Sequence, residues 1–92
     1  MEALRLSPDS PEVHCNLGMA LFHAGRVTEA VEHFEQALRI EPDYVDAHFD
    51  LGLALEKLGR TPEAIEQYQQ TLKLRPDSAA ARSALIRLGA GK

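Results

Sequence analysis

The stretch Leu38-Arg39-Ile40-Glu41-Pro42-Asp43 is the strongest indication of the fold, because close variants of it occur at two other places in the chain. Residues 4–9 read LRLSPD, and residues 72–77 read LKLRPD. The proline therefore returns every 34 residues, at Pro8, Pro42 and Pro76. A constant spacing of this size is typical of a solenoid, in which one pair of helices is copied along an axis.

Outward from these prolines, glycine and proline divide the chain into helix-sized segments. Ser10, Thr61 and Ser78 carry oxygens that can cap a helix start, and Gly25 and Gly59 suit the left-handed conformation that often follows a helix end. The sequence thus predicts an all-α fold of antiparallel helix pairs. The expected helices are Pro11–Ala24, Val27–Ile40, Val45–Leu58, Thr61–Leu74 and Ala79–Leu88, with Met1–Leu6 as the end of a preceding helix.

Two glycines occupy the same place in the two copies, in the middle of a predicted helix. Glycine at such a place costs about 1 kcal/mol relative to alanine. Gly18 and Gly52 therefore indicate that another helix closely approaches the backbone there. We expect small alanines of the following helix opposite these glycines and larger rings beside them, namely Ala30, Ala64, Phe34 and Tyr68.

Composition narrows the class of protein. Ninety-two residues with 45% hydrophobic and 26% charged side chains are ordinary for one small globular domain. No apolar segment approaches the roughly 20 residues that span a bilayer, and the N-terminus lacks the features of a secretion signal. We therefore expect a cytoplasmic protein without a membrane partner. The net charge of −4 argues against nucleic-acid binding, which usually shows a basic stripe.

Catalytic and metal-binding motifs are missing from the sequence. It contains no glycine-rich phosphate loop, no paired-acid motif and no nucleophile elbow. His14 and His48 hold the same place in separate copies and are not expected to converge, while His23 and His33 fall on different helices. The single cysteine, Cys15, has no helix start beside it to activate its thiol. We predict a protein that is not an enzyme and that has no metal and no cofactor.

These positions together resemble the tetratricopeptide repeat family, whose phrase is W-x2-L-G-x2-Y, then A-x3-F, then P. The first copy matches as His14-x2-Leu17-Gly18-x2-Leu21, Ala30-x3-Phe34 and Pro42. The second matches as His48-x2-Leu51-Gly52-x2-Leu55, Ala64-x3-Tyr68 and Pro76. The resemblance implies a right-handed α–α superhelix in which 1–92 form one domain. Residues 1–10 would end a preceding repeat, 11–44 and 45–78 would be two full repeats, and 79–92 would be a capping helix and tail.

The resemblance also implies a concave groove that holds an extended peptide or a partner helix. This groove would lie on the face of the first helix of each pair that does not pack within the repeat. An apolar floor and an acidic rim favour a partner with apolar anchors and some positive charge. The alternative is that some of these residues pack between successive repeats. The expected groove residues are Glu12, Cys15, Asn16, Met19, Phe22, His23, Asp46, Phe49, Asp50, Leu53, Glu56 and Lys57, continued on the last helix by Ala80, Ser83, Ala84 and Arg87.

Two peptide-gripping modes of similar proteins are matched poorly. An asparagine ladder, as in the superhelix attached to protein O-linked sugar transferases, requires an asparagine in each copy, but Asp50 and Ala84 follow Asn16. A clamp for a C-terminal carboxylate requires basic side chains. The matching positions carry none, being Cys15, Met19, Asp50, Ala80 and Ala84.

The function implied by the resemblance is a protein–protein interaction scaffold that binds a peptide or helix of an unknown protein. One alternative is a substrate-docking or regulatory segment of a larger enzyme, for example a glycosyltransferase. Another is a self-assembly module that forms a homo-oligomer through an open N-terminal end.

Overall fold

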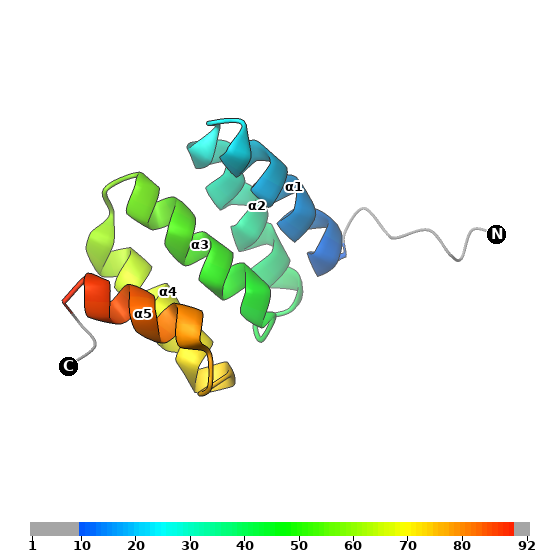
Figure 1. Cartoon of the computed structure of the whole chain (residues 1–92). Coiled ribbons are helices and arrows are strands. Elements are labelled where there is room, and N and C mark those ends of the chain that lie inside the picture. Colours follow the sequence, from blue (N-terminus) through cyan, green and yellow to red (C-terminus); the bar gives the residue numbers. More distant parts are fainter. Residues whose placement is uncertain (1–9, 90–92) are drawn as a thin grey trace.

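The structure, a computed structural model, describes residues 10–89, which form five α-helices and no strand (Figure 1). In chain order the helices are α1 (Pro11–His23), α2 (Val27–Ile40), α3 (Val45–Lys57), α4 (Thr61–Leu74) and α5 (Ala79–Arg87). The all-α prediction is confirmed. Helices α1, α3 and α5 end one residue earlier than predicted, because Ala24, Leu58 and Leu88 are their C-terminal caps. The predicted helix end at Met1–Leu6 lies outside the described residues.

Helix starts are capped by serine at two of the three predicted places. Ser10 and Ser78 each accept a hydrogen bond of 3.2 Å from the backbone amide three residues later. Thr61 is instead the first helical residue of α4, and its cap, Arg60, makes no side-chain capping bond. The prediction of a Thr61 cap was therefore wrong. The Arg60 guanidinium instead pairs with Glu63 in the first turn of the helix.

In both copies the first helix ends two residues before the predicted glycine. Gly25 and Gly59 have φ angles of +87° and +80°, a region that favours glycine. In each copy the amide after the glycine bonds to the carbonyl five residues earlier, at 2.8 Å. These bonds satisfy carbonyl groups that the helix would otherwise leave free, so the two turns hold the same geometry.

Antiparallel helix pairs stack side by side to form the fold. Figure 1 shows α1, α3 and α5 in one layer, with α2 and α4 behind them. Helix α1 packs against α2, α3 packs against α4, and contacts between α2 and α3 join the two pairs. The rings of Phe34 and Tyr68 are the largest fully buried side chains. This arrangement brings α1, α3 and α5 together along one side of the molecule.

The two mid-helix glycines lie directly against these rings. A Cβ atom on Gly18 would lie 2.5 Å from Cε1 of Phe34, and one on Gly52 would lie 2.7 Å from Cε1 of Tyr68. Real Cβ atoms essentially never approach so closely, so any other residue at either position would force the ring or the backbone to shift. The close approach was predicted correctly, but the nearest atoms belong to the rings rather than to the alanines expected there.

Equivalent leucines of the two pairs differ in exposure. Leu17 on α1 is 45% exposed, whereas Leu51 on α3 is 4% exposed. Helix α3 packs against its partner α4 and also against α2 of the preceding pair, whereas within residues 10–89 no helix pair precedes α1. Part of the packing face of α1 is therefore open to solvent at Leu17.

Candidate functional site

The candidate site is the groove face, which we define as the predicted groove residues of α1 and α3 together with Arg87 of α5. Six of them are exposed, six are half-buried, and Cys15, at 5% exposure, is buried. The exposed side chains are Glu12, Asn16, His23, Asp46, Lys57 and Arg87. The half-buried side chains are Met19, Phe22, Phe49, Asp50, Leu53 and Glu56.

A buried polar contact joins α1 to α3 beneath this face. The Cys15 thiol donates a hydrogen bond of 3.4 Å to Oδ2 of Asp50. Burial, and the negative charge of Asp50, raise the pKa of the Cys15 thiol to about 12, so the thiol stays protonated at neutral pH. Burial also raises the pKa of Asp50, an effect that the bond from Cys15 partly offsets. Cys15 therefore joins two helices, and its protonated thiol is a weak nucleophile at neutral pH.

The same contact interrupts the polar row along the face. Asn16 is exposed, but Asp50, the next residue in the same register, points one oxygen at the Cys15 thiol. Ala84, the third position, is buried and has no polar side chain. The described structure thus holds no continuous row of amides for a peptide backbone.

A second polar contact ties together three helices at the other end of α3. Oε1 of Glu56 accepts a hydrogen bond of 2.8 Å from the Tyr68 hydroxyl on α4, and Oε2 accepts one from the Arg87 guanidinium on α5. The bond from Arg87 lowers the pKa of the Glu56 carboxyl, which is therefore ionised at neutral pH. Sequence reasoning missed this contact. The only signal for it was that Tyr68 stands where the first copy has Phe34.

A shallow depression opens beside this contact, between α3 and α5. Its volume is about 490 Å³, and its lining residues are Leu53, Glu56, Lys57 and Arg87. Leu53 supplies an apolar floor, while Lys57 and Arg87 carry positive charges at the rim. Sequence reasoning placed all four residues on the predicted groove or its continuation, and the structure brings them together.

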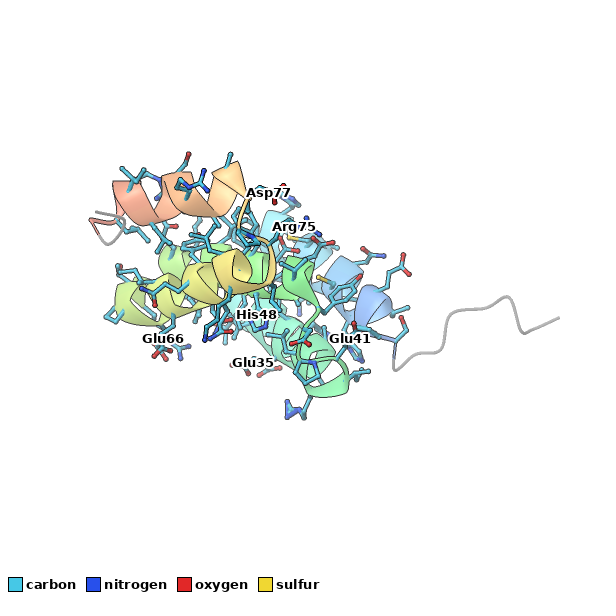
Figure 2. The ribbon with its side chains drawn as sticks, turned by 90° about the horizontal axis from the view of Figure 1, so that it is seen from below. Glu35, Glu41, His48, Glu66, Arg75 and Asp77 are labelled. Carbon is cyan, nitrogen blue, oxygen red and sulfur yellow. The ribbon has the colours of Figure 1, made fainter. Side chains whose placement is uncertain are left out.

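One histidine contact lies between the helices of each pair. Nδ1 of His14 is 3.1 Å from Nδ1 of His33, which sequence reasoning did not bring together. In the second pair, Nδ1 of His48 is 2.8 Å from Oε1 of Gln67, and its Nε2 is 2.8 Å from the Pro42 carbonyl oxygen. Figure 2 shows His48 on the side of the molecule that also carries Glu35, Glu41 and Glu66.

These histidines do not build a metal centre. Structural zinc usually takes four protein ligands, and catalytic zinc takes three. Within residues 10–89 no group of three or more histidine, cysteine, aspartate or glutamate side chains is placed to hold a metal ion. In the same part of the chain, no helix is both long enough and apolar enough to cross a membrane.

The sequence matches one protein-family model, and the fold resembles several solved structures. A family model described as tetratricopeptide repeat matches residues 9–77. The crystal structure of MamA is 28% identical in sequence and superposes with a TM-score of 0.83 over 94% of this chain and 53% of MamA. The first TPR of Spaghetti (RPAP3), described as bound to the HSP90 peptide SRMEEVD, is 24% identical, with a TM-score of 0.87 over 90% of this chain and 66% of that one.

A tetratricopeptide repeat domain protein from Salinibacter ruber has the same fold. It is 24% identical, with a TM-score of 0.78 over 90% of this chain and 99% of that one. This chain thus spans about half of the MamA chain and about two thirds of the RPAP3 chain. No curated protein sequence matches it.

Proposed function

Because the chain belongs to the tetratricopeptide repeat family, we propose that it is a non-catalytic protein-interaction module that binds a peptide or helix of a partner protein along the groove face. The proposal includes the division into two repeats, 11–44 and 45–78, followed by a capping helix. Helices α1, α3 and α5 would present the binding side chains, while α2 and α4 would hold them in place.

Partly open apolar side chains on α1 and α3 carry this proposal. They pack against the core on one side and remain half-exposed on the other. Covering such surface with a partner contributes roughly 25 cal/mol per Å² of apolar area removed from water, and the entropy lost on association opposes this gain. These side chains are Met19, Phe22, Phe49 and Leu53.

Charge at the edge of the face adds selectivity. Glu12 and Asp46 are exposed in the first turns of α1 and α3. Opposite charges across an interface steer association and suppress wrong partners more than they add affinity. The partner segment should therefore carry positive charge where it passes these helix starts.

The RPAP3 domain supports the proposal at the level of the fold, since a protein with this architecture holds a peptide. Its peptide, SRMEEVD, carries three acidic residues among its last four. This chain lacks basic side chains at Cys15, Met19 and Asp50, where a carboxylate clamp would need them. We therefore propose a partner that is recognised through apolar anchors rather than through its C-terminal carboxylate.

Selection from a displayed library of random 12-residue peptides tests the proposal. We expect the purified chain to enrich peptides with apolar anchors, and synthetic copies to bind in fluorescence anisotropy. The double variant Met19→Glu, Leu53→Glu should weaken this binding at least tenfold. A matched control, Gln36→Glu with Gln70→Glu, adds the same two charges at exposed positions on α2 and α4 and should bind normally.

Thermal unfolding of each variant checks that it remains folded. Should the double variant unfold, Glu12→Lys with Asp46→Lys, which alters exposed side chains only, takes its place and should weaken the binding of basic peptides. Failure to enrich any peptide would contradict the proposal. Equal binding by the groove-face and control variants would show that the partner uses another surface.

A second candidate function, self-association, rests on the exposure of Leu17. This leucine is 45% exposed although its equivalent Leu51 is buried, so the outer side of α1 could pack against another copy. Sedimentation at increasing concentration tests this candidate. A rise in mass that Leu17→Glu abolishes would support it, and a monomer at all concentrations would exclude it.

A further inference from the structure

The depression between α3 and α5 has a charge opposite to that of the acidic helix starts. Both carboxylate oxygens of Glu56 are occupied, one by the Tyr68 hydroxyl and the other by Arg87. The Glu56–Arg87 pair is neutral as a unit. Lys57 is exposed and makes no ion pair with another of the residues 10–89. The net charge at this depression is therefore positive.

The depression also has an apolar part. Leu53 is half-buried, packs against the core and lines the opening. A volume of about 490 Å³ accommodates an aliphatic or aromatic side chain of a partner. The Glu56–Arg87 pair forms a wall that its hydrogen bonds hold in place, so an entering side chain would meet a preformed shape.

The equivalent place in the first pair is built differently. Phe22 stands where the second pair has Glu56, and its ring packs against the core and against the edge of His23 with ring centroids 5.6 Å apart. An aromatic ring there takes the place of a charged pair. The two positions along the groove face therefore suit different parts of one partner.

Helix dipoles account for some of this charge distribution, because acids favour helix starts and bases favour helix ends. They do not account for an apolar opening next to Lys57. Asp46 and Lys57 lie 11 residues apart on α3, which is about 16 Å along a helix at 1.5 Å per residue. A partner that runs along α3 would thus meet negative charge at one end and positive charge at the other.

We propose that the α3–α5 depression receives an apolar side chain of the partner whose immediate neighbour is acidic, with the acid pairing with Lys57. This inference rests on the proposed function and adds the chemistry of one anchor. At the Lys57 end of α3 the partner would carry an acidic residue, whereas at the Asp46 end it would carry a basic residue.

Two displayed peptide libraries test the inference. They are identical random 12-residue libraries, except that one fixes Leu-Asp at its centre and the other fixes Leu-Lys. We expect the purified chain to bind peptides selected from the Leu-Asp library at least threefold more tightly at low ionic strength, with a smaller preference at high salt. The variant Lys57→Glu should reverse the preference. Lys73→Glu, the same charge change at an exposed position on α4, should leave the preference intact.

The outcomes separate this inference from the proposed function. Equal affinity for the two libraries, or a preference that survives Lys57→Glu, would overturn the inference. If the inference failed in this way but the double variant Met19→Glu, Leu53→Glu still lost peptide binding, the proposed function would stand without the inference. Enrichment from neither library would contradict both.

Discussion

The hydroxyl of Tyr68 donates a 2.8 Å hydrogen bond to the Glu56 carboxylate, and this bond has no counterpart in the first helix pair. Phe22 and Phe34 stand at the equivalent positions there and carry no polar atoms in their side chains. Because Glu56 also binds Arg87 of α5, the Tyr68 hydroxyl helps to fix the last helix to the second pair. The same residues border the α3–α5 depression.

Replacement of Tyr68 by phenylalanine should weaken this connection. The ring remains and fills the same space, but a buried donor to a charged acceptor is lost. We expect the free energy of unfolding to fall by about 1 kcal/mol, measured by urea denaturation. Tyr44→Phe is a suitable control, since the Tyr44 hydroxyl makes no side-chain hydrogen bond within residues 10–89. Equal losses in the two variants would show that the Tyr68–Glu56 bond contributes nothing.

Lowering the pH should remove the contribution that ionised Glu56 makes to the free energy of unfolding. Arg87 lowers the pKa of this carboxyl in the folded chain, so its stabilising effect is present above the ordinary glutamate value of 4.5 and is lost as the pH falls below it. At pH 7 the free energy of unfolding of the wild type should exceed that of Glu56→Gln by about 1 kcal/mol. Denaturation at a series of pH values should show the two curves meeting below pH 4. A constant gap at all pH values would contradict an ionic role.

Asp50 should have the opposite pH dependence. Burial raises the pKa of this carboxyl in the folded chain, so its ionised form destabilises the fold at neutral pH and the penalty is relieved as the pH falls. Asparagine can still accept the hydrogen bond from Cys15. We expect Asp50→Asn to stabilise the chain by up to about 1 kcal/mol at pH 7 and by less at pH 4. Thermal unfolding at both pH values measures this, and a less stable variant at pH 7 would refute the burial argument.

The two histidine contacts allow the equivalence of the helix pairs to be tested. His14 faces His33 as His48 faces Gln67, and the partners are 19 positions apart in the sequence in both cases. His33→Gln copies the second pair into the first and should change the unfolding free energy by less than about 0.5 kcal/mol. His33→Leu leaves His14 without this partner and should cost about 1 kcal/mol. Should glutamine prove as costly as leucine, the two contacts would not be equivalent.

The sequence predicted those features that depend on one helix pair alone. Helix ends could be predicted because Gly25 and Gly59 adopt positive φ angles in the same place of each copy. The close approach at Gly18 and Gly52 could be predicted because glycine is unfavourable in a helix unless space is short. A family match over residues 9–77 agrees with this reading.

Contacts between helix pairs could not be predicted in this way. Cys15 bonds to Asp50 across 35 residues, and Arg87 bonds to Glu56 across 31. Neither separation equals the 34-residue period, because each depends on how one pair is rotated against the next and on how far a particular side chain reaches. The 34-residue spacing gives neither the rotation between pairs nor the reach of a side chain. The half-buried apolar side chains of α1 and α3 follow from the repeat pattern, and their role as a groove floor stays a prediction. The Cys15–Asp50 bond and the α3–α5 depression required the structure.

The sharpest test of the packing of a helix backbone against a buried ring in each pair is the free energy of unfolding of Gly52→Ala. In a helix with free space, alanine in place of glycine would stabilise the chain by about 1 kcal/mol. Here the new Cβ would lie 2.7 Å from the fully buried Tyr68 ring, so we expect a loss of about 1–3 kcal/mol, and Gly18→Ala against Phe34 should behave alike. A gain in stability at Gly52 would show that the backbone and the ring do not pack in this way.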